Sequence, residues 1–101
     1  MSEGDDRRPA IPPEASFLTI LYTMATQAMI ALGQIPNPLT REAKFDPRQA
    51  KWHIDSLQIL RDKTRGNLSE VEETALMNTL AEVRMKYVEL AGSVGAGGPP
   101  G

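Results

Sequence analysis

The chain carries one histidine, His53, and no cysteine, so thiolate metal sites are excluded and a single histidine cannot form a metal cluster by itself. A histidine acting as a general base needs an orienting partner, and one acting as a metal ligand needs further ligands. His53 stands on the apolar side of a predicted helix, where a structural or interface role is more common. We therefore predict no catalytic residue, no metal site and no cofactor, and we expect the chain not to be an enzyme.

The carboxylates and glycines are arranged for helix ends. The acidic residues form neither a D-x-D calcium loop nor an H-E-x-x-H motif. Glu70, Glu72 and Glu73 fall in the first turn of a predicted helix, where negative charge is favourable. Gly33 and Gly66 follow predicted helices, whereas phosphate-binding glycines precede them. These patterns indicate where helices begin and end, and they indicate no ligand site.

Arg84 lies beside apolar residues of the third predicted helix and away from its acidic face. The commoner arrangement packs the stem of such an arginine and leaves its guanidinium in water. The alternative is an ion pair at an interface, with Asp55 or Asp62 as the partner. We expect the first arrangement and keep the second open.

Length and composition predict one small domain between two tails. Residues 1–14 are rich in charge and proline, and residues 92–101 are almost all glycine and proline, so both are expected to be disordered and to flank a helical domain at 15–91. A core of this size supplies only about 3–5 kcal/mol, which favours reinforcement by self-association.

The net charge of −2 offers no basic footprint for nucleic acid. Without cysteine or a signal-peptide pattern, we expect a cytoplasmic protein.

Apolar periodicity and capping residues predict an all-α fold with three helices. The first spans about residues 15–32. The second begins at Asp46, Pro47 and Gln49, a helix-start pattern, and the third begins at Ser69 and is expected to end at Gly92. The connection between the second and third helices is so short that they should form an antiparallel hairpin, with the first helix packed across it.

The long connection between the first two helices contains Pro36 and Pro38, which disfavour helix in the residues before them. We predict an extended, stiff loop. Ile35 and Leu39 are its large apolar side chains, and we expect both to hold the loop against the helices.

The first helix carries no charge between Glu14 and Arg41, and a helix that is apolar on most sides is buried on most sides or lies in a membrane. Its apolar run of about 16–17 residues spans about 25 Å, which is short for a hydrocarbon core of about 30 Å. We therefore favour burial in a homo-oligomer, most simply a dimer, and keep membrane insertion or interfacial binding of residues 15–33 as an alternative. The residues expected at the interface are Phe17, Leu21, Met24, Trp52, Ile59 and Arg84.

Four segments carry a family resemblance: residues 27–38 with the run A-L-G-x-I-P-N-P, residues 54–57, residues 63–68 with the turn K-T-R-G-N-L, and residues 83–88. Over about residues 17–89 the chain resembles a family of short bacterial proteins known as domain of unknown function 1844. The resemblance implies a small helical protein of bacterial origin and brings no activity, substrate or catalytic residue. Met29 and Ile30 stand where the family tends to show other aliphatic residues, which affects packing detail only.

These observations together favour a small oligomeric helical module, an adaptor or scaffold whose apolar faces bind a helix of its own or of a partner protein. A membrane-associated subunit is the second possibility, and an enzyme is the least favoured.

Overall fold

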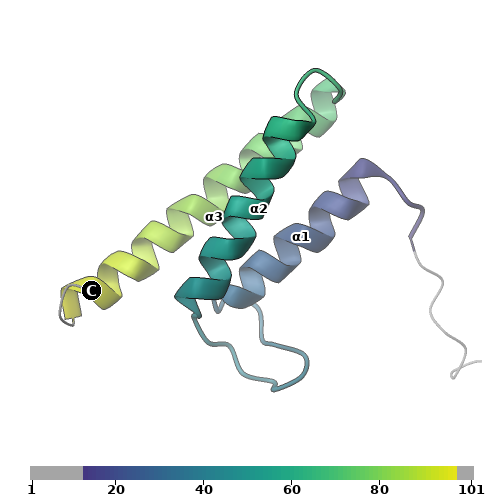
Figure 1. Ribbon diagram of the computed structural model, residues 1–101. Helices are drawn as coiled ribbons and strands as arrows, with labels where there is room; N and C mark the ends of the chain where they lie inside the picture. Colours follow the sequence, from purple (N-terminus) through teal and green to yellow (C-terminus); the bar gives the residue numbers. More distant parts are fainter. Residues whose placement is uncertain (1–12, 98–101) are drawn as a thin grey trace, which may run out of the picture.

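The computed structural model describes residues 13–97, the last five of them as backbone only. It contains the three predicted helices: α1 over Phe17–Ala31, α2 over Pro47–Lys63 and α3 over Glu70–Gly97. Each helix packs against both others. In Figure 1, α2 and α3 lie side by side and run in opposite directions, and α1 lies along the other side of α2. The described residues form no strand, only one isolated backbone bridge.

Side chains that accept hydrogen bonds from free backbone N–H groups begin all three helices. The hydroxyl of Ser69 accepts from the N–H of Glu72, whose carboxylate accepts from the N–H of Ser69, as the capping box predicts. A carboxylate oxygen of Asp46 accepts from the N–H of Gln49 at 3.2 Å. Ser16 and Thr19 form a further capping box at the start of α1, a feature that was not predicted from the sequence.

A glycine turn ends α1 and directs the chain back toward α2. Gly33 adopts a φ of 76°, its N–H donates to the carbonyl of Ile30, and the N–H of Gln34 donates to the carbonyl of Met29. This is the bonding pattern of a Schellman helix end, so the predicted role of Gly33 is confirmed. A Cβ on Gly33 would stand only 3.0 Å from the backbone nitrogen of Phe45.

The loop between α1 and α2 is closed by backbone bonds where it leaves and re-enters the helices. Leu32 and Phe45 form the isolated antiparallel bridge, and the N–H of Asp46 donates to the carbonyl of Ala31 at 2.8 Å. At its outer end the loop folds around Asn37, whose side-chain oxygen accepts from the N–H of Leu39. The predicted role of Leu39 is therefore wrong: this side chain is 91% exposed because the loop satisfies its own backbone at that end.

The core is a single apolar cluster to which all three helices contribute. Its fully buried large side chains come from one face of each helix and from the residue after α1, and they are Leu21, Leu32, Leu57, Leu76, Leu80 and Val83. Two alanines, Ala28 in α1 and Ala50 in α2, are fully buried in the same cluster. No polar or charged side chain is buried among the described residues.

Polar and aromatic contacts join the elements around the edge of this core. Arg61 of α2 lies 3.9 Å from the carboxylate of Glu73 of α3. The rings of Phe45 and Tyr87 meet edge to face with centroids 6.0 Å apart, so the loop also contacts α3. Such contacts orient the elements, while the apolar cluster supplies most of the stabilisation.

Helix α3 extends to Gly97, past Gly92, where the sequence predicted its end. The extension contains Gly92 and Gly95, and each glycine inside a helix costs only about 1 kcal/mol relative to alanine. The next proline is Pro99. Of the predicted tails, residues 1–12 and 98–101 lie outside the described residues, whereas residues 92–97, expected to be disordered, belong to α3.

Replacing a core leucine by alanine should destabilise the fold strongly. Leu57→Ala and Leu80→Ala should each lower the free energy of unfolding by about 2–5 kcal/mol, because each leaves a cavity in a buried cluster. Urea unfolding followed by circular dichroism measures this. Leu39→Ala removes the same atoms from an exposed side chain and should stay within about 0.5 kcal/mol of the parent chain. Similar losses from all three variants would mean that the core has been misplaced.

The two glycines with positive φ should respond differently to alanine. Gly66 has a φ of 84°, and a Cβ added there would meet no neighbouring atom within 4 Å, so Gly66→Ala should cost about 1 kcal/mol from backbone strain alone. Gly33→Ala adds the contact with Phe45 and should cost clearly more. Equal losses of unfolding free energy in the two variants would show that the Gly33 turn tolerates a side chain.

Candidate functional site

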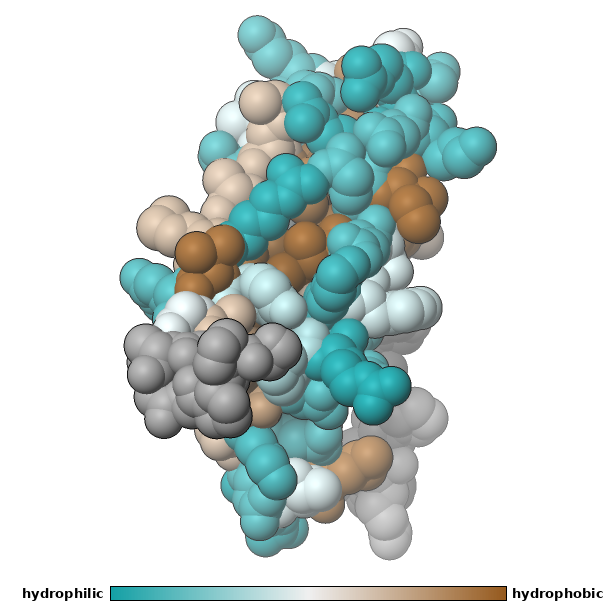
Figure 2. Space-filling model, turned by 60° about the vertical axis from the view of Figure 1, so that its left-hand side comes forward, coloured by the Kyte–Doolittle hydropathy of each residue, from teal (hydrophilic) through white to brown (hydrophobic). Residues whose placement is uncertain are grey.

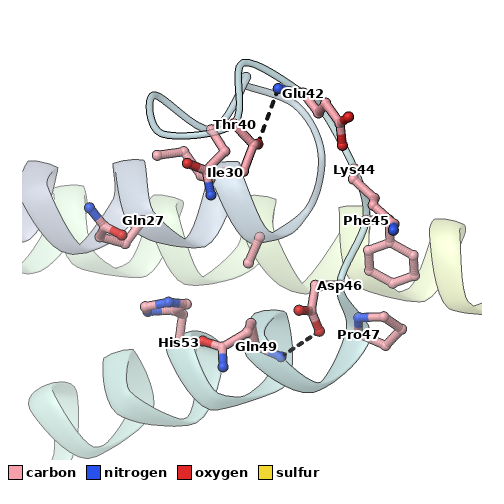
Figure 3. A pocket seen from close by; sticks show the side chains of 12 residues that line it. Gln27, Ile30, Thr40, Glu42, Lys44, Phe45, Asp46, Pro47, Gln49 and His53 are labelled. Carbon is pink, nitrogen blue, oxygen red and sulfur yellow. Dashed lines mark hydrogen bonds between the residues drawn. The ribbon is translucent and has the colours of Figure 1, made fainter.

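The described part of the chain contains a pocket of about 560 Å³ between the end of α1, the loop and the start of α2. Figure 3 shows Gln27 projecting from α1 and His53 and Gln49 from α2, with the loop residues on the remaining side. Ile30, Ala31, Phe45 and Pro47 supply its apolar lining. The pocket thus combines an apolar wall with neutral amides and with four ionisable groups, those of Glu42, Lys44, Asp46 and His53.

The ionisable groups of the pocket are engaged in local structure or exposed. Asp46 caps α2, and the hydroxyl of Thr40 accepts from the backbone N–H of Glu42, as drawn in Figure 3. Glu42 and Lys44 are exposed. Across residues 13–97, no group of three or more His, Asp or Glu side chains is placed to hold a metal ion. The pocket could accept a small polar molecule by shape, but the geometry pairs no nucleophile with a base.

His53 lies at the edge of this pocket, half-buried, on the first half of α2. Its ring meets the indole of Trp52 edge to face, with centroids 5.0 Å apart and an interplanar angle of 88°. Burial lowers the pKa of His53 below its ordinary value, because a partly desolvated imidazole resists protonation. Burial therefore favours the uncharged form of the ring, which acts as part of the packing.

The structure places the three interface candidates of α1 in or against the core of the chain itself. Leu21 is fully buried, and Phe17 and Met24 are partly buried and pack against the cluster. The interface prediction for Leu21 is therefore wrong, since no surface of this side chain is accessible. The apolar character of α1 is explained in part by contacts with α2 and α3, while Ile20 and Tyr22 remain 54% and 56% exposed.

Trp52 and Ile59 lie together on the outward flank of α2, 63% and 59% exposed. Arg84 is also exposed, and its guanidinium donates to the side-chain oxygen of Gln58 across the α2–α3 contact. Gln58 in turn donates to Asp62 at 3.0 Å. Arg84 thus reaches Asp62 only through an amide, and Asp55 pairs with Lys51 at 2.7 Å, so the ion pair considered for Arg84 does not form within the chain.

The outward face of α3 carries apolar side chains that were not predicted from the sequence. Met77, Met85 and Val88 are 45%, 62% and 68% exposed, although large apolar side chains usually avoid the solvent side of a helix. Figure 2 shows brown, apolar patches interrupting the hydrophilic surface of the molecule. These residues form a second apolar stripe that can be found in the sequence. The core-facing stripe, which includes Leu76 and Leu80, has the more regular helical spacing and was the one recognised.

No helix in the described residues has the length and apolar character needed to cross a membrane.

A family model described as domain of unknown function (DUF1844) matches residues 14–89. No curated protein and no solved structure is significantly similar to the chain.

The pKa of His53 should lie below the ordinary value of about 6.5. Because the folded chain then binds a proton less readily than the unfolded chain, the free energy of unfolding should fall as the pH decreases through that value and should be unaffected by this residue above it. Ring-proton chemical shifts of this single histidine give the pKa directly, and thermal unfolding gives the stability. His53→Gln should remove this part of the pH dependence. A measured pKa at or above 6.5 would contradict the assignment.

Proposed function

The chain belongs to the family described as domain of unknown function (DUF1844), and we propose that it is a small oligomeric interaction module, an adaptor or scaffold without catalytic activity of its own. It assembles with itself and presents a further apolar face to a partner protein. Helices with exposed apolar stripes commonly bind other helices in this way.

One observation carries the proposal: large apolar side chains stand outward on all three helices, most strongly on α2 and α3, of a domain that already has an apolar core. The core leucines of α2 and α3 point inward and are fully buried. Trp52, Ile59, Met85 and Val88 are nevertheless about three-fifths or more exposed. Groups of exposed apolar residues commonly mark interaction surfaces, and tryptophan and methionine are enriched there.

The chemistry of the pocket supports binding rather than catalysis. An active site combines a concave pocket with titratable groups of matched pKa and a geometry that joins them. Here Asp46 serves as a helix cap, and His53 contacts the ring of Trp52. The contacts of these two residues are thus a helix cap and an aromatic packing contact, which supports a role for the pocket in binding rather than in catalysis.

Sedimentation equilibrium from micromolar to millimolar concentration tests the proposal. We expect reversible association to twice the 11.1 kDa mass of the chain, because exposed apolar area is removed from water when two copies meet. Circular dichroism recorded over the same range should show no change in helicity. A mass of 11.1 kDa at every concentration would refute self-assembly.

A further inference from the structure

The outward face of α3 follows the spacing of a coiled-coil seam. Six exposed residues recur at alternating intervals of three and four: Val71, Thr74, Asn78, Ala81, Met85 and Val88. In heptad notation the first, third and fifth occupy a positions and the others occupy d positions. Residues spaced alternately by three and four recur every 3.5 residues on average. In a coiled coil this spacing keeps one stripe of a helix facing its partner helix along the whole length.

This seam lies opposite the face of α3 that builds the core. At 100° per residue, Val71, Asn78 and Met85 fall more than 120° from Leu76 and Leu80, which are buried. A second helix could therefore pack on the seam without displacing α1 or α2. The seam residues carry no charge over nearly five turns, where the solvent face of a helix ordinarily carries several.

We propose that α3 pairs with α3 of a second copy of the chain, in parallel and in register, along this seam. The inference rests on the proposed function and identifies the surface and the partner used for self-assembly. The helix is already held by the core of its own subunit, so pairing does not carry the ordering cost that an isolated short coiled coil would meet.

Asn78 favours a second copy over an unrelated partner and favours the parallel arrangement. A single asparagine at an a position specifies register and a two-stranded state, because its amide both donates and accepts hydrogen bonds. In a parallel pair, Asn78 meets Asn78 of the other copy and each amide satisfies the other. An antiparallel pair that matches Val71 with Val88 would place Asn78 opposite Ala81, which offers no side-chain partner.

The charges beside the seam complement one another in the same arrangement. Arg84 occupies the g position on one side and Glu89 the e position on the other, and in a parallel pair a g residue meets the e residue of the following heptad in the partner. Gln58 accepts from Arg84 within the subunit, but a guanidinium has five N–H donors. The two symmetric Arg84–Glu89 contacts would be attractive, and no like charges would meet at the other flanking positions.

Introducing a charged side chain into the seam tests whether this surface forms the dimer contact. Met85→Glu should raise the dissociation constant of the dimer by at least about 100-fold, because the symmetric contact would bury two unpaired carboxylates. Ile59→Glu is the matched control, since Ile59 on α2 is 59% exposed and Met85 is 62% exposed. It should leave the dimer intact, and circular dichroism should show both variants folded. A dimer lost with Ile59→Glu and kept with Met85→Glu would overturn the seam while preserving the proposed function.

A single cysteine tests the direction of pairing, because the chain has none of its own. In the parallel arrangement Val88→Cys places the two thiols against each other, and mild oxidation should convert most of the protein to a disulfide-linked dimer. In the antiparallel arrangement the two copies of residue 88 would lie about 25 Å apart, and no such dimer would form. Ile59→Cys should remain uncrosslinked under the same conditions. Failure of Val88→Cys to crosslink in a chain that dimerises would overturn the parallel register.

Discussion

The attachment of the end of α1 to the start of α2 is the constraint on which the fold most depends. The bridge between Leu32 and Phe45 and the bond from the N–H of Asp46 to the carbonyl of Ala31 close a long loop at its base. With that base closed, α1 begins its contact with α2 in a fixed register, and the loop adds little freedom to the folded chain. Gly33 makes the closure possible because it lacks a side chain. A Cβ at this position would stand 3.0 Å from the backbone nitrogen of Phe45, which the closed loop brings close.

Sequence predicted the features that depend on local chemistry. Asp46 before Pro47 and Ser69 before Glu72 mark helix starts through side-chain to backbone bonds spanning only three residues, and the three-helix, all-α class follows from periodicity. The family resemblance likewise rested on short contiguous runs and is confirmed by the match over residues 14–89. Information of this kind is contained within one or two helical turns, so it can be read without knowing the tertiary arrangement.

Sequence could not predict which apolar residues the three helices cover. Leu21 and Trp52 are both large and apolar, yet one is fully buried and the other is 63% exposed, a difference set by the rotation of each helix against its neighbours. Leu39 was expected to contact the helices, but the hydrogen bonds around Asn37 turn the end of the loop outward. The second stripe of α3 was hidden for a related reason: apolar residues on opposite faces of one helix weaken the contrast on which amphipathic patterns depend.

The outward apolar side chains of α2 and α3 also have a calorimetric consequence. Unfolding raises the heat capacity mainly by exposing apolar surface to water. Side chains such as Trp52 and Val88, which are already hydrated in the separate subunit, contribute little to that increase. The separate subunit should consequently have a shallow curve of unfolding free energy against temperature. The proposed dimer would bury more apolar surface, and its curve would be more strongly bent.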